Sequence, residues 1–103
     1  MLNPLHIINQ LFEIRTKLEE LGMSDKFERN LNRLDSIFEE EGYIIQNPTG
    51  QSYSEARSDC DASIAGQISS KMIVTRTLKP IIYQKSNDGV QLQQKGIVIV
   101  ENK

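Results

Sequence analysis

The chain has 103 residues, enough for one modest domain or two very small units. Its formal charge is −2 at pH 7, so nothing at the level of the whole chain indicates binding to nucleic acid or to an anionic membrane. The one cysteine, Cys60, cannot form a disulfide within the chain, and a lone thiol is typical of a reducing cytosol. No run approaches the roughly 20 apolar residues of a membrane span, and the N-terminus has no signal pattern. We therefore expect a cytoplasmic protein.

The charge and the residue pattern both change near Gln46. Residues 1–46 hold five basic and nine acidic side chains, a net charge of −4, whereas residues 47–103 hold seven basic and five acidic ones, a net charge of +2. An excess of two positive charges is too small for a surface that tracks phosphates. We expect an α+β chain with a helical hairpin over residues 1–46 and a small all-β domain over residues 47–103.

The first helix is predicted from a start signal, an apolar stripe and a stop signal. Asn3 is a good cap, and Pro4 suits the first helical position because its missing N–H would be unpaired there. Gly22 favours a left-handed end to the helix. The apolar residues recur at steps of four and three, which keeps them on one face: Ile7, Leu11, Ile14, Leu18 and Leu21.

A second helix is predicted between Ser24 and Gly42. Asp25 and Glu28 have the spacing of a capping box, and Gly42 marks the end. The stripe continues with the same steps: Phe27, Leu31, Leu34 and Phe38. The link over residues 22–24 is so short that the two helices must fold back as an antiparallel hairpin.

The two helices have more apolar surface than they can cover alone. Ile8, Phe12 and Ile37 widen the stripes, and we expect them to face solvent in a single copy. Helices of this length are marginal in isolation, whereas two hairpins can form a four-helix bundle. We therefore expect a homodimer, and its predicted interface consists of Ile7, Leu11, Ile14, Leu18, Leu31, Leu34 and Phe38.

The second half of the chain has the alternation of β-strands. Residues 43–45 form a short apolar run, and residues 51–70 are polar, with one short strand expected over 62–67. From Lys71 the period is two, which predicts a strand with Met72, Val74 and Leu78 on one face.

Three more strands are predicted toward the C-terminus. The run Pro80–Tyr83 is followed by Ser86-Asn87-Asp88-Gly89, a strong hairpin turn signal, and residues 90–93 form the returning strand. The last strand spans residues 96–101. Its run Ile97–Val100 does not alternate, so we expect it to be central and covered on both faces.

This order of parts is similar to the GrpE family, the nucleotide exchange factors of DnaK-type chaperones. The family's long N-terminal stalk helix has no counterpart, because the likeness begins at the bundle. Short segments carry the resemblance: Leu5–Leu11, Leu34–Ile45, Thr49–Tyr53, Met72–Pro80, Asn87–Gly89 and Gly96–Val100. The chain departs from the family pattern at Ser54–Cys60, where the family has Asp-Pro-x-x-His-x-Ala, at Val90 in place of Arg, and at Pro80 in place of Gly.

The resemblance implies an exchange factor that promotes ADP release from a DnaK-type chaperone or a related ATPase. It implies that the β-domain contacts the chaperone through Leu78, Lys79, Asn87, Asp88, Gly89 and Val100. The alternative is that Leu78 and Val100 are core residues and that the turn is only a turn. The departures from the family pattern favour an alternative function, a dimeric scaffold or binding module without exchange activity.

Candidate catalytic and metal-binding residues are few. His6 is the only histidine, and no Ser or Cys stands in a motif that would complete a triad with it. Asp59-Cys60-Asp61 is better explained as a solvated loop than as a metal site, because adjacent side chains point in different directions. Glu39-Glu40-Glu41 is either a solvated helix face or an acidic contact with a partner. No phosphate-binding loop is present. We expect no enzymatic activity, metal or cofactor, and no nucleic-acid or membrane partner.

Overall fold

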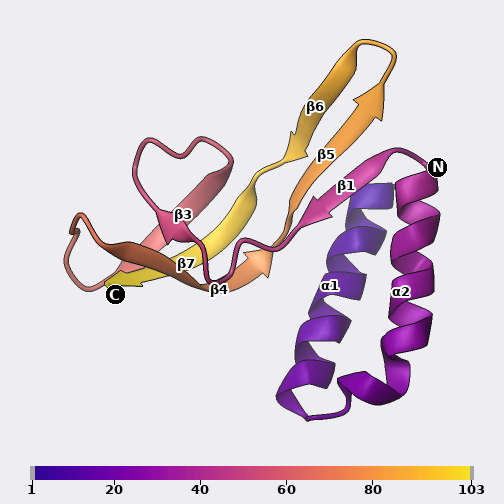
Figure 1. Ribbon diagram of the computed structural model, residues 1–103, viewed down its shortest axis with the longest axis horizontal. Coiled ribbons are helices and arrows are strands. Elements are labelled where there is room, and N and C mark those ends of the chain that lie inside the picture. The colour runs from indigo at the N-terminus through magenta and orange to yellow at the C-terminus, as the bar shows by residue number, and fades with distance from the viewer. Residues whose placement is uncertain (1, 103) are drawn as a thin grey trace.

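The computed structural model describes residues 2–102 and has the α+β architecture expected from the sequence (Figure 1). Two antiparallel helices, α1 (Pro4–Glu20) and α2 (Ser24–Glu40), precede two β-sheets. The strands of the described residues are β1 (Tyr43–Gln46), β2 (Ser52–Tyr53), β3 (Cys60–Ala65), β4 (Met72–Lys79), β5 (Ile81–Ser86), β6 (Gly89–Gln94) and β7 (Gly96–Asn102).

The helix ends follow the sequence signals at three of four points. The Asn3 Oδ1 accepts a hydrogen bond from the Leu5 N–H at 3.0 Å, and Gly22 and Gly42 have φ of +70° and +91° where the helices stop. The capping box predicted for α2 does not form. The helix begins at Ser24 and Met23 is its N-cap residue, so Asp25 lies inside the first turn and no side chain caps the helix. A carboxylate there still has a favourable interaction with the helix dipole.

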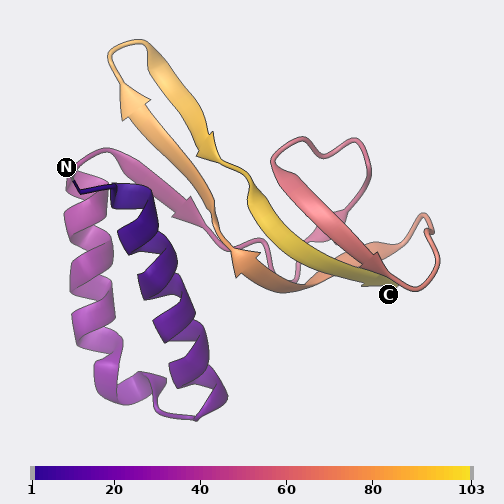
Figure 2. The same ribbon diagram turned by 180° about the vertical axis from the view of Figure 1, so that it is seen from behind.

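The helical hairpin packs against the β-domain, which corrects one prediction. Ile8 and Phe12 were expected to face solvent, but only 2% and 9% of their surfaces are exposed. Asn9 on α1 and Gln94 at the end of β6 exchange two side-chain hydrogen bonds, each 2.9 Å long, and Gln94 also donates to the Pro80 carbonyl at 2.9 Å. Figures 1 and 2 show α1 on the side of the hairpin nearer to sheet two. The apolar residues that widen the α1 stripe therefore hold the two parts together.

The strands form two sheets, and very short links connect one sheet to the other. Sheet one is antiparallel in the order β1-β5-β6, and sheet two has the order β2-β4-β7-β3, with β3 parallel to β7. Single residues, Pro80 and Lys95, link β4 to β5 and β6 to β7. A Cβ atom on Gly96 would lie 2.9 Å from the Ile81 Cγ1, so glycine permits the close approach at this bend.

The main core lies on the inner face of sheet two and continues onto Ile81 of sheet one. Its buried members are Cys60, Met72, Val74, Ile81, Val98 and Val100. Strand β7 is central, as predicted, but its second face is not covered, since Ile97 is exposed and Ile99 is half-buried. Strand β3 starts two residues earlier than the expected short strand.

Register shifts in β4 change which residues face the core. The β4–β7 pairing slips between Val74 and Arg76 and again between Thr77 and Lys79. Because side chains alternate along a strand, an extra residue exchanges the two faces. Thr77 is consequently buried, and Leu78 faces outward instead of sharing a face with Met72 and Val74 as predicted.

Candidate partner-binding surfaces

The β5–β6 hairpin presents the predicted turn at its tip. It projects away from both the helices and sheet two (Figure 1). Asn87, Asp88 and Gly89 are all exposed, and Gly89 has φ of +110°. The Ser86 hydroxyl accepts a hydrogen bond from the Asp88 N–H at 3.3 Å and donates to the Gly89 carbonyl at 3.4 Å. These local bonds define the shape of the turn and leave the Asn87 and Asp88 side chains accessible.

Leu78 and Lys79 form a second accessible point at the end of β4. Leu78 is 43% exposed and lies at the rim of a shallow pocket of about 170 Å³ between α1 and β4. Phe12, Thr16 and Lys17 line its helical side, and Thr77 lies on its strand side. Glu13, Glu20 and Arg76 also line the pocket, so most of its side chains are polar or charged.

Val100 differs from the other expected contact residues. None of its surface is exposed, and it belongs to the main core. The prediction that Val100 contacts a partner directly is therefore wrong, and the alternative, a core residue, is correct. The structure does not gather the remaining residues into one patch. The whole of β5, roughly 20 Å at the usual rise of a strand, separates Leu78 and Lys79 from the hairpin tip.

The residues expected at a dimer interface fall into three groups. Ile7 and Ile14 are exposed on α1, and they are one heptad apart, so they lie on the same face. Leu31 is buried within the single chain and has no surface left for a second copy. The others are half-buried: Leu11, Leu18, Leu34 and Phe38.

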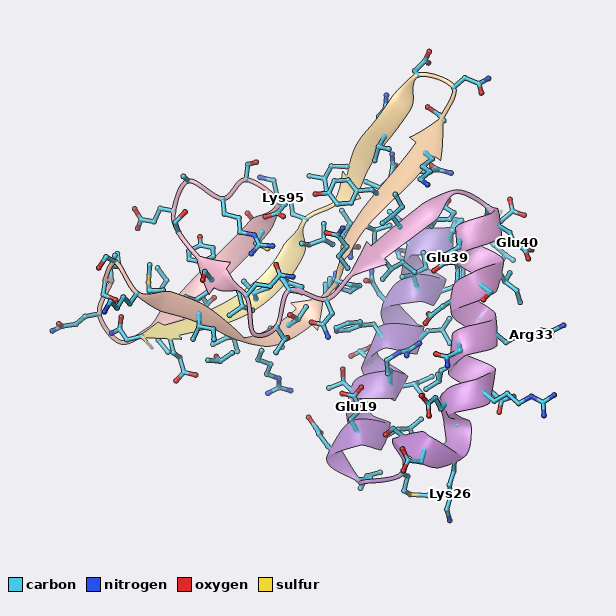
Figure 3. The ribbon with its side chains drawn as sticks, in the orientation of Figure 1. Glu19, Lys26, Arg33, Glu39, Glu40 and Lys95 are labelled. Carbon is cyan, nitrogen blue, oxygen red and sulfur yellow. The ribbon has the colours of Figure 1, made fainter. Side chains whose placement is uncertain are left out.

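Further apolar side chains extend the exposed surface of the hairpin beyond the predicted interface. Phe27 and Ile37 are exposed on α2, and Leu21 and Met23 are exposed at the helix–helix turn. The charged side chains of α2 include Lys26 and Arg33, which point away from the rest of the molecule in Figure 3. The helical hairpin thus has uncovered apolar surface on both helices.

The segment that departs from the GrpE pattern is held by Arg57. Its guanidinium forms an ion pair with Asp59 at 2.6 Å and also donates to the Ser52 carbonyl at 3.2 Å and to the Gln51 Oε1 at 2.9 Å. The hydrogen bond from Arg57 lowers the pKa of Asp59, although partial burial opposes this, and the bond to Asp59 raises the pKa of Arg57. Sequence reasoning did not identify this cluster. The Arg-x-Asp spacing on an otherwise small and polar segment is the signal that could have revealed it.

The residues considered for catalysis or metal binding lie in separate environments. His6 is exposed on α1, whereas Cys60 is buried and desolvation raises the pKa of its thiol. Asp61 is exposed and lies 3.9 Å from the Lys95 ammonium. Among residues 2–102, no group of three His, Cys, Asp or Glu side chains is placed to hold a metal ion. Glu39 and Glu40, at the end of α2, are exposed.

Comparisons with known proteins add no assignment: no protein family, curated protein or solved structure matches this chain. No helix within the described part of the chain is long and apolar enough to cross a lipid bilayer.

Proposed function

We propose that this protein is a GrpE-like co-chaperone that promotes ADP release from a DnaK-type chaperone. The observation that carries the proposal is the order of parts, which resembles that of the family: a helical hairpin followed by a β-domain with an exposed Asn87–Gly89 turn. Leu78 and Lys79 supply a second exposed contact on the same domain. The DnaK-type chaperone is proposed as the partner because of the sequence resemblance.

The proposed mechanism needs no bond-making by the protein. An ATPase that opens and closes its nucleotide cleft populates both states, and a protein that binds the open state more tightly increases the open population. ADP then leaves faster because the closed, ADP-holding state is less populated. Linkage requires that ADP weaken the binding of this protein by the same factor by which the protein weakens the binding of ADP. A tenfold effect corresponds to about 1.4 kcal/mol of coupling.

The test is the release of a fluorescent ADP analogue from DnaK-type chaperones of the same organism. Release should accelerate with this protein and lose the acceleration in the variant Asn87→Ala/Asp88→Ala, which keeps Gly89 and the turn. The matched control is Glu28→Ala/Asn30→Ala, an exposed acid–amide pair on α2. Unchanged release with every chaperone of this type, in a folded sample, would refute exchange activity.

We also propose that the molecule is a homodimer through the exposed faces of the helical hairpin. The support is the apolar surface that a single copy leaves uncovered, with Ile7 and Ile14 on α1 and Phe27 and Ile37 on α2. Ile8, Phe12 and Leu31 are excluded from this interface because the single chain already buries them. A monomer in analytical ultracentrifugation at micromolar concentration would contradict it.

A second candidate function is a dimeric scaffold that has the fold without the exchange activity. The Arg57 cluster supports it, because this cluster occupies the segment where the family has its histidine-containing motif. Val90, in the place of the family's arginine, is an exposed apolar residue. A scaffold would bind its partner with the same affinity whether or not ADP is present, and this outcome separates the two candidates.

A further inference from the structure

The outer edge of β6 is the most open strand edge of the two sheets. Strand β6 ends sheet one and pairs only with β5 on its inner side. Its first five residues, Gly89–Gln93, are exposed, and none is charged or proline. Natural proteins usually protect such an edge with a charge, a proline or a covering segment, because its free N–H and C=O groups can pair with another strand. Figures 1 and 2 show the hairpin projecting away from the other elements.

The other three sheet edges differ from β6. Strand β2 has two residues and β1 has four, so they offer few free groups. Strand β3 is longer, but it carries Asp61 next to Lys95 of the β6–β7 link. Only β6 combines length, an uncharged surface and exposed apolar side chains, with Val90 55% exposed and Leu92 41% exposed.

The hydrogen-bond pattern shows which groups of β6 are free. The Lys85 N–H donates to the Gly42 carbonyl at 2.8 Å, so the backbone of Lys85 points toward the β1 side and away from β6. Lys85 pairs with Val90 and Tyr83 with Leu92. In an antiparallel ladder, hydrogen-bonded and non-bonded pairs alternate, so Val90 and Leu92 are in non-bonded pairs with β5. Their N–H and C=O groups therefore point outward along the free edge.

We infer that β6 pairs with β6 of a second copy of this chain. In antiparallel pairing centred on Gln91, Val90 of each copy lies opposite Leu92 of the other, and Gly89 lies opposite Gln93. Val90 and Leu92 are the residues with outward backbone groups, so the two copies form four hydrogen bonds. The side-chain pattern and the backbone pattern thus select the same register, and shifting it by one residue would place apolar side chains opposite glutamines.

The charges at the ends of β6 also match this arrangement. Asp88 precedes the strand and Lys95 follows it, and antiparallel pairing brings the beginning of one strand near the end of the other. The β5–β6 register shifts between Ile82 and Tyr83, which limits the regular edge to about Gly89–Leu92. The result is a continuous sheet in the order β1-β5-β6-β6-β5-β1. This association is separate from the proposed helical dimer, because it pairs backbone groups of β6 and needs no side chain of the helices.

Disulfide cross-linking at the centre of the register tests the inference. In the Cys60→Ala background, Gln91→Cys places two thiols in a directly opposed pair, with the Cα atoms about 4.5–5.5 Å apart, within the range for a disulfide. The control Gln93→Cys is equally exposed on the same strand, but its two copies are offset by four residues, roughly 13 Å. Under mild oxidant, position 91 should cross-link at least about tenfold faster than position 93 on a non-reducing gel.

A second pair of variants distinguishes cross-linking through β6–β6 pairing from cross-linking through random collision of the thiols. Leu92→Pro removes an outward N–H without removing a bond to β5, and proline is tolerated on an edge strand. Introduced with Gln91→Cys, it should abolish the fast cross-linking while circular dichroism remains unchanged. Ile97→Lys removes a comparably exposed apolar residue from sheet two and should leave cross-linking intact. Equal rates at positions 91 and 93, or fast cross-linking that survives Leu92→Pro, would overturn the inference whether or not the helices dimerise.

Discussion

Truncation of Ile8 tests whether the helical hairpin and the β-domain form one cooperative unit. Ile8 is 2% exposed, whereas the adjacent Ile7 on α1 is 38% exposed. Removing a buried isoleucine side chain to alanine costs about 2–5 kcal/mol, as the sum of lost transfer energy and a residual cavity. Each part is small and would bury a thin core by itself. We therefore expect Ile8→Ala to lower the stability of helices and strands together.

The assay is urea unfolding monitored by far-ultraviolet circular dichroism at two protein concentrations. The loss of unfolding free energy in Ile8→Ala should be the same at both protein concentrations, because Ile8 is covered within one chain. The Ile7→Ala loss should be smaller and should grow with protein concentration, because any contact it makes is with a second copy. The reasoning is refuted if Ile7→Ala costs as much as Ile8→Ala at low concentration, or if Ile8→Ala melts only the helical signal.

Three further substitutions or reactions test single features of the fold. Gly42→Ala should destabilise the protein more than Gly22→Ala in urea unfolding. Both glycines have a positive φ, which alone costs an alanine about 1–2 kcal/mol, but only at Gly42 would the new Cβ lie 3.1 Å from the Lys85 carbonyl oxygen. Equal losses of stability in the two variants would exclude strain from that contact. The hydrogen bond from Arg57 lowers the pKa of Asp59, so its stabilisation is complete above the unfolded value near pH 4 and is lost as the pH falls through the lower folded value. The stability gap between the wild type and Asp59→Asn should therefore be constant from pH 7 to about 5 and shrink in more acidic solution; a gap that is unchanged at pH 3 would contradict this. Burial raises the pKa of the Cys60 thiol, so a disulfide reagent should modify the native protein far more slowly than the urea-unfolded chain, and fast native labelling would show that this part of the core opens readily.

The elements predicted from local patterns are the ones that the structure confirms. Steps of three and four residues located both helices, glycines located their ends, and Ser86-Asn87-Asp88-Gly89 located the β5–β6 hairpin. These signals are local, because a cap or a turn needs only a few adjacent residues to form. The change from helices to strands comes earlier than the expected division at Gln46, because Tyr43–Gln46 form β1 and pair with β5.

The orientation of particular side chains depended on packing that the sequence does not show. Leu78 was expected beside Met72 and Val74, but register shifts in β4 turn it outward, and a bulge has no reliable pattern in a strand without glycine. Ile8 and Phe12 appeared to be spare apolar surface for a dimer because no local signal shows that α1 docks on β4, which lies far along the chain. Val100 was included as a contact residue by resemblance, whereas its position in the central strand β7 buries it.

The affinity of this protein for a DnaK-type chaperone, measured with and without ADP, tests the exchange function most directly. Titration of the purified chaperone by isothermal calorimetry gives both dissociation constants, and the protein's effect on ADP affinity is measured in the same way. The proposal predicts that ADP weakens binding, and that the factor equals the one by which the protein weakens ADP binding. An affinity that is unchanged by ADP, or no binding to any chaperone of this type, would contradict exchange and leave the scaffold as the function that the fold supports.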